Sequence, residues 1–443
     1  MTEDLIMEEY DICVIGAGSG GISAALEASS LGAKVVVVEK EEIGGVCLNR
    51  GCIPAKAYLK SASVYDELKR SNDLGIVHKD ITYNLSNIQH RTKEVINRLK
   101  GQIESSLKSR KVDLIKGRAS FLDGQHIEVN ERRLKASSFI IASGSSPRPL
   151  GSIEVDNKRT FYSDGIFDID RMPKDITIIG AGPIGCEFAS FFSAFGVEVT
   201  LVEMLERILP RGDREISNRL EGILKKRGIK ILTSSRCDIN AISSDAILIS
   251  TGRTANINGF GLEKIGVAIK NGVICADEHL RTNLRGIFAV GDCIGKYNLA
   301  HVASAEGKVA ARNALGKKVA MDYTIIPDCV YSFPEVSSVG LTEEEATKRG
   351  YDVRIGRMHF AGLGRAQAHG ETDGFIKLVV DKKSDAILGA QILGYYATEL
   401  IGAISIAIRG KLKIEDLADV VQAHPTFSEG IQLAAQNLFR QTI

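Results

Sequence analysis

The sequence predicts an α/β fold in which one strand-turn-helix pattern occurs twice and is followed by a C-terminal α+β domain. An apolar strand runs into a GxGxxG turn within residues 10–21, and the same pattern returns within residues 175–185. From Tyr323 onward the chain mixes strand and helix patterns without a glycine fingerprint of its own. The two repeats therefore predict two Rossmann-like dinucleotide-binding domains.

Each repeat carries the groups that a dinucleotide requires. Glycines in the turn let backbone amides and a helix N-terminus approach a pyrophosphate. These glycines are Gly16, Gly18, Gly21, Gly180, Gly182 and Gly185. A second strand follows each helix and ends in an acid that can accept hydrogen bonds from a ribose, Glu39 after strand 35–38 and Glu203 after strand 197–202. This spacing, found twice, predicts two bound dinucleotides.

The second acid also bears on which nicotinamide nucleotide is bound. Glu203 would repel a 2′-phosphate, and its neighbours Met204 and Leu205 offer no guanidinium to receive one. The sequence therefore favours NAD over NADP, although Arg207 is close enough along the chain to keep the alternative open.

Two cysteines after the first repeat predict a redox disulfide. Cys47 and Cys52 lie in the run GGVCLNRGCIPAK. On a regular helix their α-carbons would be roughly 7.5 Å apart along the axis, too far for a disulfide. Gly51 allows the chain to depart from a helix between them, and Pro54 suits the first turn of a helix predicted over 54–68, so Cys52 would lie near a helix N-terminus that favours its thiolate. The alternatives are two cysteines that only pack and, against the spacing, a zinc site; no metal is predicted.

A disulfide exchanges electrons through thiolate chemistry and a nicotinamide through hydride transfer, so a mediator is required. A flavin can do both, which predicts FAD in the first repeat, beside the cysteines, and NAD in the second. Further candidate contacts are Lys56, Gly144 and Asp292 for FAD, and Glu187 and Gly252 for NAD. Asp292 would bond the flavin ribityl chain or cap a turn, and Lys56 and Glu187 would form an ion pair beside the flavin or remain surface charges.

Thiol chemistry also requires a base. His424 stands in the run AHPTFSE, and Glu429, five residues on, could orient the ring and stabilise an imidazolium. A histidine before Pro-Thr is by itself more typical of a turn or a helix start. Its occurrence in a chain with a redox motif favours the base.

Composition describes an ordinary globular protein, with 44% hydrophobic and 25% charged residues. The net charge of +1 and the absence of a basic block argue against nucleic acid or a membrane as partner. The stretch Met1–Tyr10 is acidic and has no signal segment, and eight scattered cysteines suit a reducing compartment. The sequence thus predicts a cytoplasmic protein, or one of an organelle matrix if a transit peptide has been removed.

Four domains are expected along the chain, an FAD-binding domain with the redox disulfide, an NAD-binding domain, a central domain that completes the FAD site, and the α+β domain. Their predicted bounds are 1–148, 149–253, 254–322 and 323–443. Helices are expected over 85–109, 300–315, 398–409, 414–421 and 427–438, and strands of the last domain over 375–380 and 386–393.

The motifs resemble those of the pyridine nucleotide-disulfide oxidoreductases over essentially the whole chain. Besides the cysteine run, the paired fingerprints and AHPTFSE, the matching segments are 291–292, 299–301, 306–307 and 334–342. Within this family the chain most resembles members that oxidise dihydrolipoyl groups with NAD. Two departures stand out: Gln422 replaces a usual histidine, and residues 231–246 are much shorter than the family's stretch there.

The resemblance implies that Cys47 is the interchange thiol, that Cys52 faces the flavin, and that the α+β domain forms a homodimer in which His424 and Glu429 serve the cysteines of the other subunit. It also implies the Lys56–Glu187 pair near the flavin N5, and a dihydrolipoyl group as substrate, for instance on a 2-oxo acid dehydrogenase or glycine cleavage complex. Two other functions stay open from sequence: a glutathione-reductase-like reductase of another small disulfide, and a non-catalytic docking or sensing flavoprotein.

Overall fold

The computed structural model describes residues 8–151, 153–238 and 241–440, so most of the acidic stretch at the start of the chain lies outside it. The chain divides into two compact units, each built from three segments. The first unit takes in the chain up to Ala57, Ser86–Pro149 and Gly252–Asp322, and the second takes in Tyr58–Leu85, Leu150–Thr251 and the chain from Tyr323.

The first unit is built on a sheet of strand order β3-β2-β1-β6-β5-β4, with β16 paired to the carboxyl end of β6. Pairings among β3, β2, β1, β6 and β16 are parallel. The segments 12–14 and 139–141 are fully buried, as expected for parallel strands covered on both faces. The strands are β1 (Glu8–Ile15), β2 (Val35–Glu39), β3 (Asp113–Lys116), β4 (Ser120–Phe121), β5 (His126–Val129), β6 (Arg132–Ile141), β7 (Ser145–Pro147), β13 (Arg253–Ala255), β14 (Ile269–Lys270), β15 (Val273–Ile274) and β16 (Ile287–Ala289).

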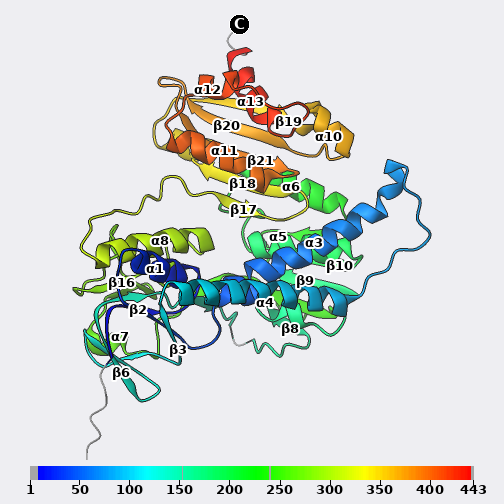
Figure 1. Cartoon of the computed structure of the whole chain (residues 1–443). Helices are drawn as coiled ribbons and strands as arrows, with labels where there is room; N and C mark the ends of the chain where they lie inside the picture. Colours follow the sequence, from blue (N-terminus) through cyan, green and yellow to red (C-terminus); the bar gives the residue numbers. More distant parts are fainter. Residues whose placement is uncertain (1–7, 152, 239–240, 441–443) are drawn as a thin grey trace, which may run out of the picture. The chain divides into compact units, whose positions relative to one another are not determined.

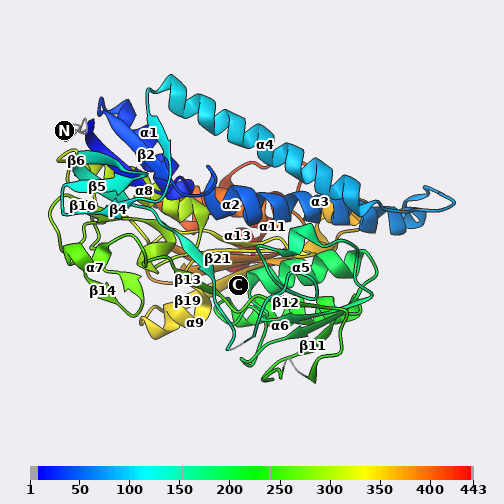
Figure 2. The ribbon, with the colours of Figure 1, turned by 90° about the horizontal axis from the view of Figure 1, so that it is seen from below.

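Helices of this unit place the cysteines and the first glycine turn. They are α1 (Ser19–Ser30), α2 (Gly45–Arg50), α4 (Leu85–Ser109), α7 (Leu262–Ile265) and α8 (Ala300–Ala314), with α3 (Cys52–Lys69) continuing into the second unit. Helices α1 and α8 pack against each other. Figure 2 shows α2 and α3 as two consecutive helices. The break between them lies at Gly51, whose φ of −140° and ψ of −113° depart from a helix, as the spacing of the cysteines required.

The second unit contains a parallel sheet of order β11-β10-β9-β12-β8 and an antiparallel sheet of order β17-β18-β21-β20-β19. The strands are β8 (Thr160–Tyr162), β9 (Asp175–Ile179), β10 (Glu198–Val202), β11 (Lys230–Leu232), β12 (Ala246–Ile249), β17 (Asp328–Val330), β18 (Glu335–Gly340), β19 (Val353–His359), β20 (Phe375–Asp381) and β21 (Ile387–Gly394). Its helices are α5 (Pro183–Ala194), α6 (Arg214–Lys226), α9 (Glu343–Lys348), α10 (Gly364–His369), α11 (Ala397–Arg409), α12 (Ile414–Asp419) and α13 (Glu429–Arg440). In the shortened stretch between β11 and β12, the described residues 233–238 and 241–245 form no strand.

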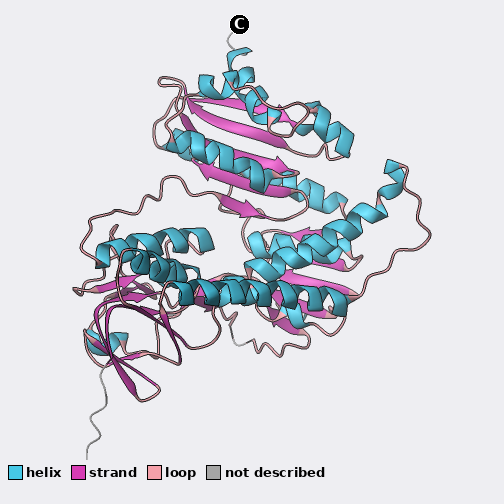
Figure 3. Ribbon diagram, in the orientation of Figure 1, coloured by secondary structure: helices cyan, strands magenta, loops and turns pink. Residues whose placement is uncertain are grey.

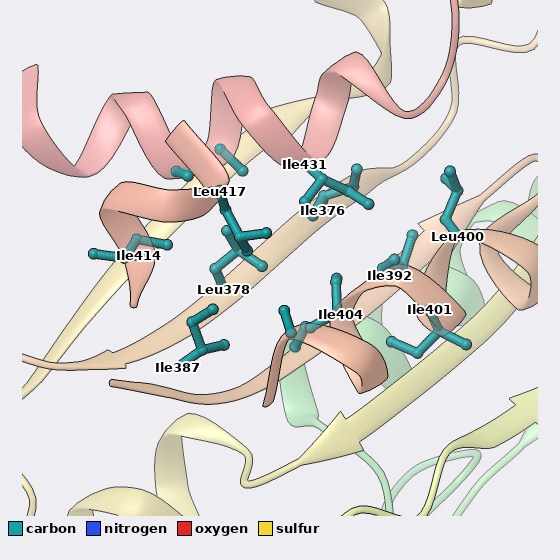
Figure 4. Close-up of a cluster of buried hydrophobic side chains, with 14 of the residues drawn as sticks. Ile376, Leu378, Ile387, Ile392, Leu400, Ile401, Ile404, Ile414, Leu417 and Ile431 are labelled. Carbon is teal, nitrogen blue, oxygen red and sulfur yellow. The ribbon is translucent and has the colours of Figure 1, made fainter. Parts of the chain in front are cut away.

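Helices α11 to α13 cover one face of the antiparallel sheet (Figures 1 and 3). Their apolar side chains meet alternate residues of β20, such as Ile376 and Leu378, in the cluster drawn in Figure 4. Two predicted helix bounds here are wrong. The helix expected over 414–421 ends at Asp419, because Val420 is extended, and the one expected from Phe427 begins at Glu429. Phe427 instead packs its ring into the core at 4% exposure.

The other face of β20 carries a buried ion cluster. The side chain of Lys377 is 3% exposed and lies 3.1 Å from Asp213, 3.1 Å from Glu215 and 2.9 Å from Glu343. Asp213 also caps α6 by accepting the amides of the second and third helical residues. The lysine therefore joins the start of α6 to the antiparallel sheet by charge.

We expect Lys377→Met to destabilise the protein by about 3 kcal/mol, because it leaves the buried carboxylate of Asp213 without a counter-ion. Lys382→Met is the matched control, since Lys382 is a 61% exposed lysine at 3.9 Å from Asp352. Its effect should stay within about 0.5 kcal/mol. Urea unfolding followed by circular dichroism measures both. Equal stabilities of the two variants would contradict a structural role of the cluster.

Candidate active site

In the first GxGxxG turn, the first and third glycines lie against the backbone, and the second has free space beside it. Gly16 has a φ of +105°, and a Cβ on it would lie 2.3 Å from the carbonyl oxygen of Ala142. A Cβ on Gly21 would lie 1.9 Å from the carbonyl oxygen of Gly16. A Cβ on Gly18, the residue before α1, would meet nothing within 4 Å. The first and third glycines thus make the turn, and the second leaves room for a phosphate at the start of the helix.

The second turn repeats this geometry. Gly180 has a φ of +101° and its Cβ would lie 2.6 Å from the Ser250 carbonyl oxygen, whereas that of Gly185 would lie 1.9 Å from the Gly180 carbonyl oxygen. Gly182, before α5, again faces open space. Both turns therefore fit a pyrophosphate.

Each predicted ribose acid holds its own turn. Glu39 accepts hydrogen bonds from the amides of Ala17 at 2.6 Å and Glu41 at 2.8 Å. Glu203 accepts them from Ala181 at 2.8 Å and from the amide two residues after itself at 2.9 Å. A carboxylate oxygen can accept more than one hydrogen bond, so both acids keep capacity for a ribose hydroxyl. The sequence placed these acids correctly but did not reveal their bonds to the backbone.

Of the residues expected to complete the FAD site, Gly144 follows β6 and Asp292 follows β16. Asp292 accepts a hydrogen bond from the Ser145 hydroxyl and does not cap a helix. Arg253, which sequence reasoning did not assign to the site, donates to the Ser145 hydroxyl at 2.7 Å and lies 4.0 Å from Asp292. Gly144 has a φ of +68°, and a Cβ on it would meet nothing within 4 Å. Gly252, the candidate NAD contact, has a φ of +108° and belongs to the first unit, whereas the second glycine turn belongs to the second unit. The position of Arg253 directly after a glycine turn was the signal for it.

Lys56 lies on α3 in the first unit, and Glu187 lies on α5 in the second. Glu187 is buried, so it is not a surface charge, and it accepts the amide of Tyr331 at 3.0 Å. Their ion pair remains a prediction.

The cysteine segment packs on the first glycine turn. The amide of Gly44 donates to the Ala17 carbonyl oxygen at 2.8 Å, and a Cβ on Gly45 would lie 2.8 Å from Cα of Gly18. Cys47 is half-buried on α2, and Cys52 is exposed at the first residue of α3. The two thiols therefore lie beside the place that the turn leaves open for a dinucleotide.

The surroundings of Cys47 raise the pKa of its thiol. A hydrogen bond to the Cys52 side chain, burial and the charge of Cys52 together hold the pKa of Cys47 well above its ordinary value. The Ser19 hydroxyl and the Cys52 amide act in the opposite direction on the same pKa. A thiolate of Cys52 thus disfavours ionisation of Cys47, and the thiolate role of Cys52 itself stays a prediction. Ser19, inside the glycine turn, was not recognised from sequence.

The predicted contact between the histidine and its acid is present. Nδ1 of His424 lies 2.8 Å from Oε1 of Glu429, the first residue of α13, and Oε2 of Glu429 accepts the Thr426 amide at 2.7 Å. The hydrogen bond with His424 comes first among the interactions that lower the pKa of Glu429 below its ordinary value. The side chain of His424 is 76% exposed. The carboxylate therefore fixes the ring and leaves Nε2 for proton exchange.

The guanidinium of Arg207 is hydrogen-bonded to two nearby backbone carbonyl groups. Its guanidinium donates to the carbonyl oxygens of Pro210 at 3.0 Å and Gly212 at 3.2 Å, and its side chain is 14% exposed. These bonds tie the guanidinium to the backbone of the loop between β10 and α6.

The described residues contain neither a metal centre nor a membrane-spanning helix. Within residues 8–151, 153–238 and 241–440, no three His, Cys, Asp or Glu side chains are placed to hold a metal ion. Over the same residues, no helix has the length and apolar character needed to cross a bilayer.

Residues 10–307 match the pyridine nucleotide-disulphide oxidoreductase family, and residues 326–435 match the dimerisation domain of that family. The chain belongs to this family of FAD-dependent, NAD-linked enzymes. Dihydrolipoyl dehydrogenase of Bacillus subtilis is 38% identical, over 96% of this chain and 97% of its own length. Dihydrolipoyl dehydrogenase of Chlamydia pneumoniae is 36% identical over 95% of each chain.

Solved structures similar to this chain support the same fold. LpdA from Mycobacterium tuberculosis has a TM-score of 0.91 at 27% identity, covering 97% of this chain and 99% of its own. The HOCl-induced flavoprotein disulfide reductase RclA from Escherichia coli has a TM-score of 0.87 at 26% identity, covering 98% of this chain and 100% of its own. The predicted fold class and the cofactors FAD and NAD are confirmed, and the dimerisation domain supports a homodimer.

Proposed function

We propose that the protein oxidises dihydrolipoyl groups to the cyclic disulfide and reduces NAD, as a dihydrolipoyl dehydrogenase. The observation that carries this proposal is the contact between Cys47 and Cys52 on the first dinucleotide turn. Full-length relatives that bear this name support the choice of substrate. A bound flavin supplies two-electron exchange between thiols and a nicotinamide.

The proposed sites follow the predicted residues. FAD is held by Gly16, Gly18, Gly21, Glu39, Lys56, Gly144 and Asp292, and NAD by Gly180, Gly182, Gly185, Glu187, Glu203 and Gly252. The corresponding domains are 1–148 for FAD, 149–253 for NAD, 254–322 for the remainder of the FAD site and 323–443 for dimerisation.

In the proposed reaction a dihydrolipoyl thiol gives its proton to Nε2 of His424 from the partner subunit. The resulting thiolate attacks Sγ of Cys47 in the Cys47–Cys52 disulfide, and Cys52 leaves as a thiolate. The second substrate thiol then displaces Cys47, which closes the substrate disulfide. Cys47 takes up the proton that its raised pKa favours. The substrate thus loses two electrons and the enzyme dithiol gains them.

The substrate is proposed to be carried by a 2-oxo acid dehydrogenase or glycine cleavage complex in the cytoplasm, or in an organelle matrix. Turnover of dihydrolipoamide and NAD, followed at 340 nm, tests the function. The second candidate, a reductase of another small disulfide, is favoured by Gln422, which stands where the family usually has histidine. Reduction of glutathione disulfide by NADH without turnover of dihydrolipoamide would establish that candidate instead.

NADH should be used at least about tenfold more efficiently than NADPH, because a 2′-phosphate would meet Glu203 and lose its ribose hydrogen bond. The kcat/KM values for the two nucleotides with one disulfide substrate measure this preference. Glu203→Gln should bring the kcat/KM for NADPH closer to that for NADH. Equal efficiencies in the unchanged protein would contradict the assignment of Glu203 to the ribose.

A further inference from the structure

We infer that Tyr396 is a specificity-determining contact for the uncharged aliphatic chain that carries the substrate disulfide. This inference rests on the proposed function. It concerns an aromatic cluster in the second unit. The cluster consists of His369, Tyr395, Tyr396 and Phe427, and Phe427 lies in the His424 loop, residues 420–428 between α12 and α13.

Tyr396 occupies a backbone position that does not suit a tyrosine. It has a φ of +62° and a ψ of +18° and is the residue that precedes α11. Left-handed backbone favours glycine or asparagine, and a helix N-cap favours a short polar side chain. The tyrosine makes no capping hydrogen bond. Strained residues of this kind persist where the side chain serves another purpose.

The ring of Tyr396 packs against Tyr395 and against Phe427, which lies in the same loop as His424. Its centroid lies 4.2 Å from that of Tyr395 and 5.7 Å from that of Phe427, three residues after His424. His369 meets the Tyr395 and Phe427 rings at 5.9 and 5.7 Å. Tyr396 is nevertheless 45% exposed, so part of a fixed ring remains available to a ligand. Fixed aromatic surface binds an aliphatic chain with little loss of side-chain entropy.

The test compares Tyr396→Asn with Tyr396→Phe. Asparagine removes the ring while suiting the left-handed backbone, so the fold should be preserved. We expect Tyr396→Asn to lower the ratio of kcat/KM for lipoamide to that for bis(2-hydroxyethyl) disulfide about tenfold, mainly through KM. Tyr396→Phe should restore most of this ratio, because it keeps the ring.

Tyr351→Asn is the matched control, since Tyr351 lies in the same unit and is 42% exposed. Its ratio should equal that of the unchanged protein. Flavin reduction by NADH in a stopped-flow experiment without disulfide should be the same in all variants. An unchanged ratio in Tyr396→Asn, with lipoamide turnover intact in the unchanged protein, would overturn the inference and leave the proposed function standing. Absence of lipoamide turnover in the unchanged protein would overturn both.

Discussion

Activity should reappear when inactive Cys47→Ser subunits exchange with inactive His424→Gln subunits. Each homodimer should lose at least about 10³-fold in turnover, because one lacks the interchange thiol and the other its base. In the heterodimer one site receives both lesions, whereas the other combines an intact cysteine pair with an intact histidine. Turnover should therefore return at about one working site per heterodimer.

The control variants are a histidine and a cysteine with exposure similar to that of His424 and Cys47. His90 has the same 76% side-chain exposure as His424 and also lies near a carboxylate, at 3.5 Å from Glu94, so His90→Gln should keep full activity. Cys275 is half-buried in the first unit, as Cys47 is, and Cys275→Ser should behave likewise. If mass spectrometry demonstrates heterodimers and they remain inactive, the model of a shared site is wrong.

The second large effect is spectroscopic. Cys47→Ser should leave Cys52 as a thiolate against the flavin and show a long-wavelength charge-transfer absorbance, because Cys52 begins α3 and its anion is stabilised there. Cys52→Ser should lack the band entirely. Acidification protonates the thiolate, so the band should fade as the pH falls through the pKa of Cys52. A band in Cys52→Ser and none in Cys47→Ser would assign the two roles in reverse.

Sequence reasoning predicted the features that follow from local geometry. The break at Gly51 was required because one helix cannot bring Cys47 and Cys52 together. The glycine turns and their acids were found because backbone approach to a phosphate imposes a spacing of residues. Such constraints act within a few residues, so they are visible in the chain itself.

Features that depend on tertiary packing were missed. Lys377 looks like any lysine in a strand, and only the position of α6 against the sheet makes it a buried counter-ion. Tyr396 contradicts the preferences of its backbone position, so propensity argues against the observed structure. The predicted start of α13 at Phe427 was wrong because its ring was needed in the core. In each case the deciding partner is distant in sequence.

The ion pair between Lys377 and Asp213 joins residues that belong to two different family matches. The match to the oxidoreductase family ends at residue 307, and the match to its dimerisation domain begins at residue 326. A chain cut between them would leave Lys377 on one piece and Asp213 on the other, each a buried charge stripped of its partner. The segment that carries Asp213 and the dimerisation domain that carries Lys377 therefore stabilise each other, and we expect the dimerisation domain to be insoluble when it is expressed without that segment.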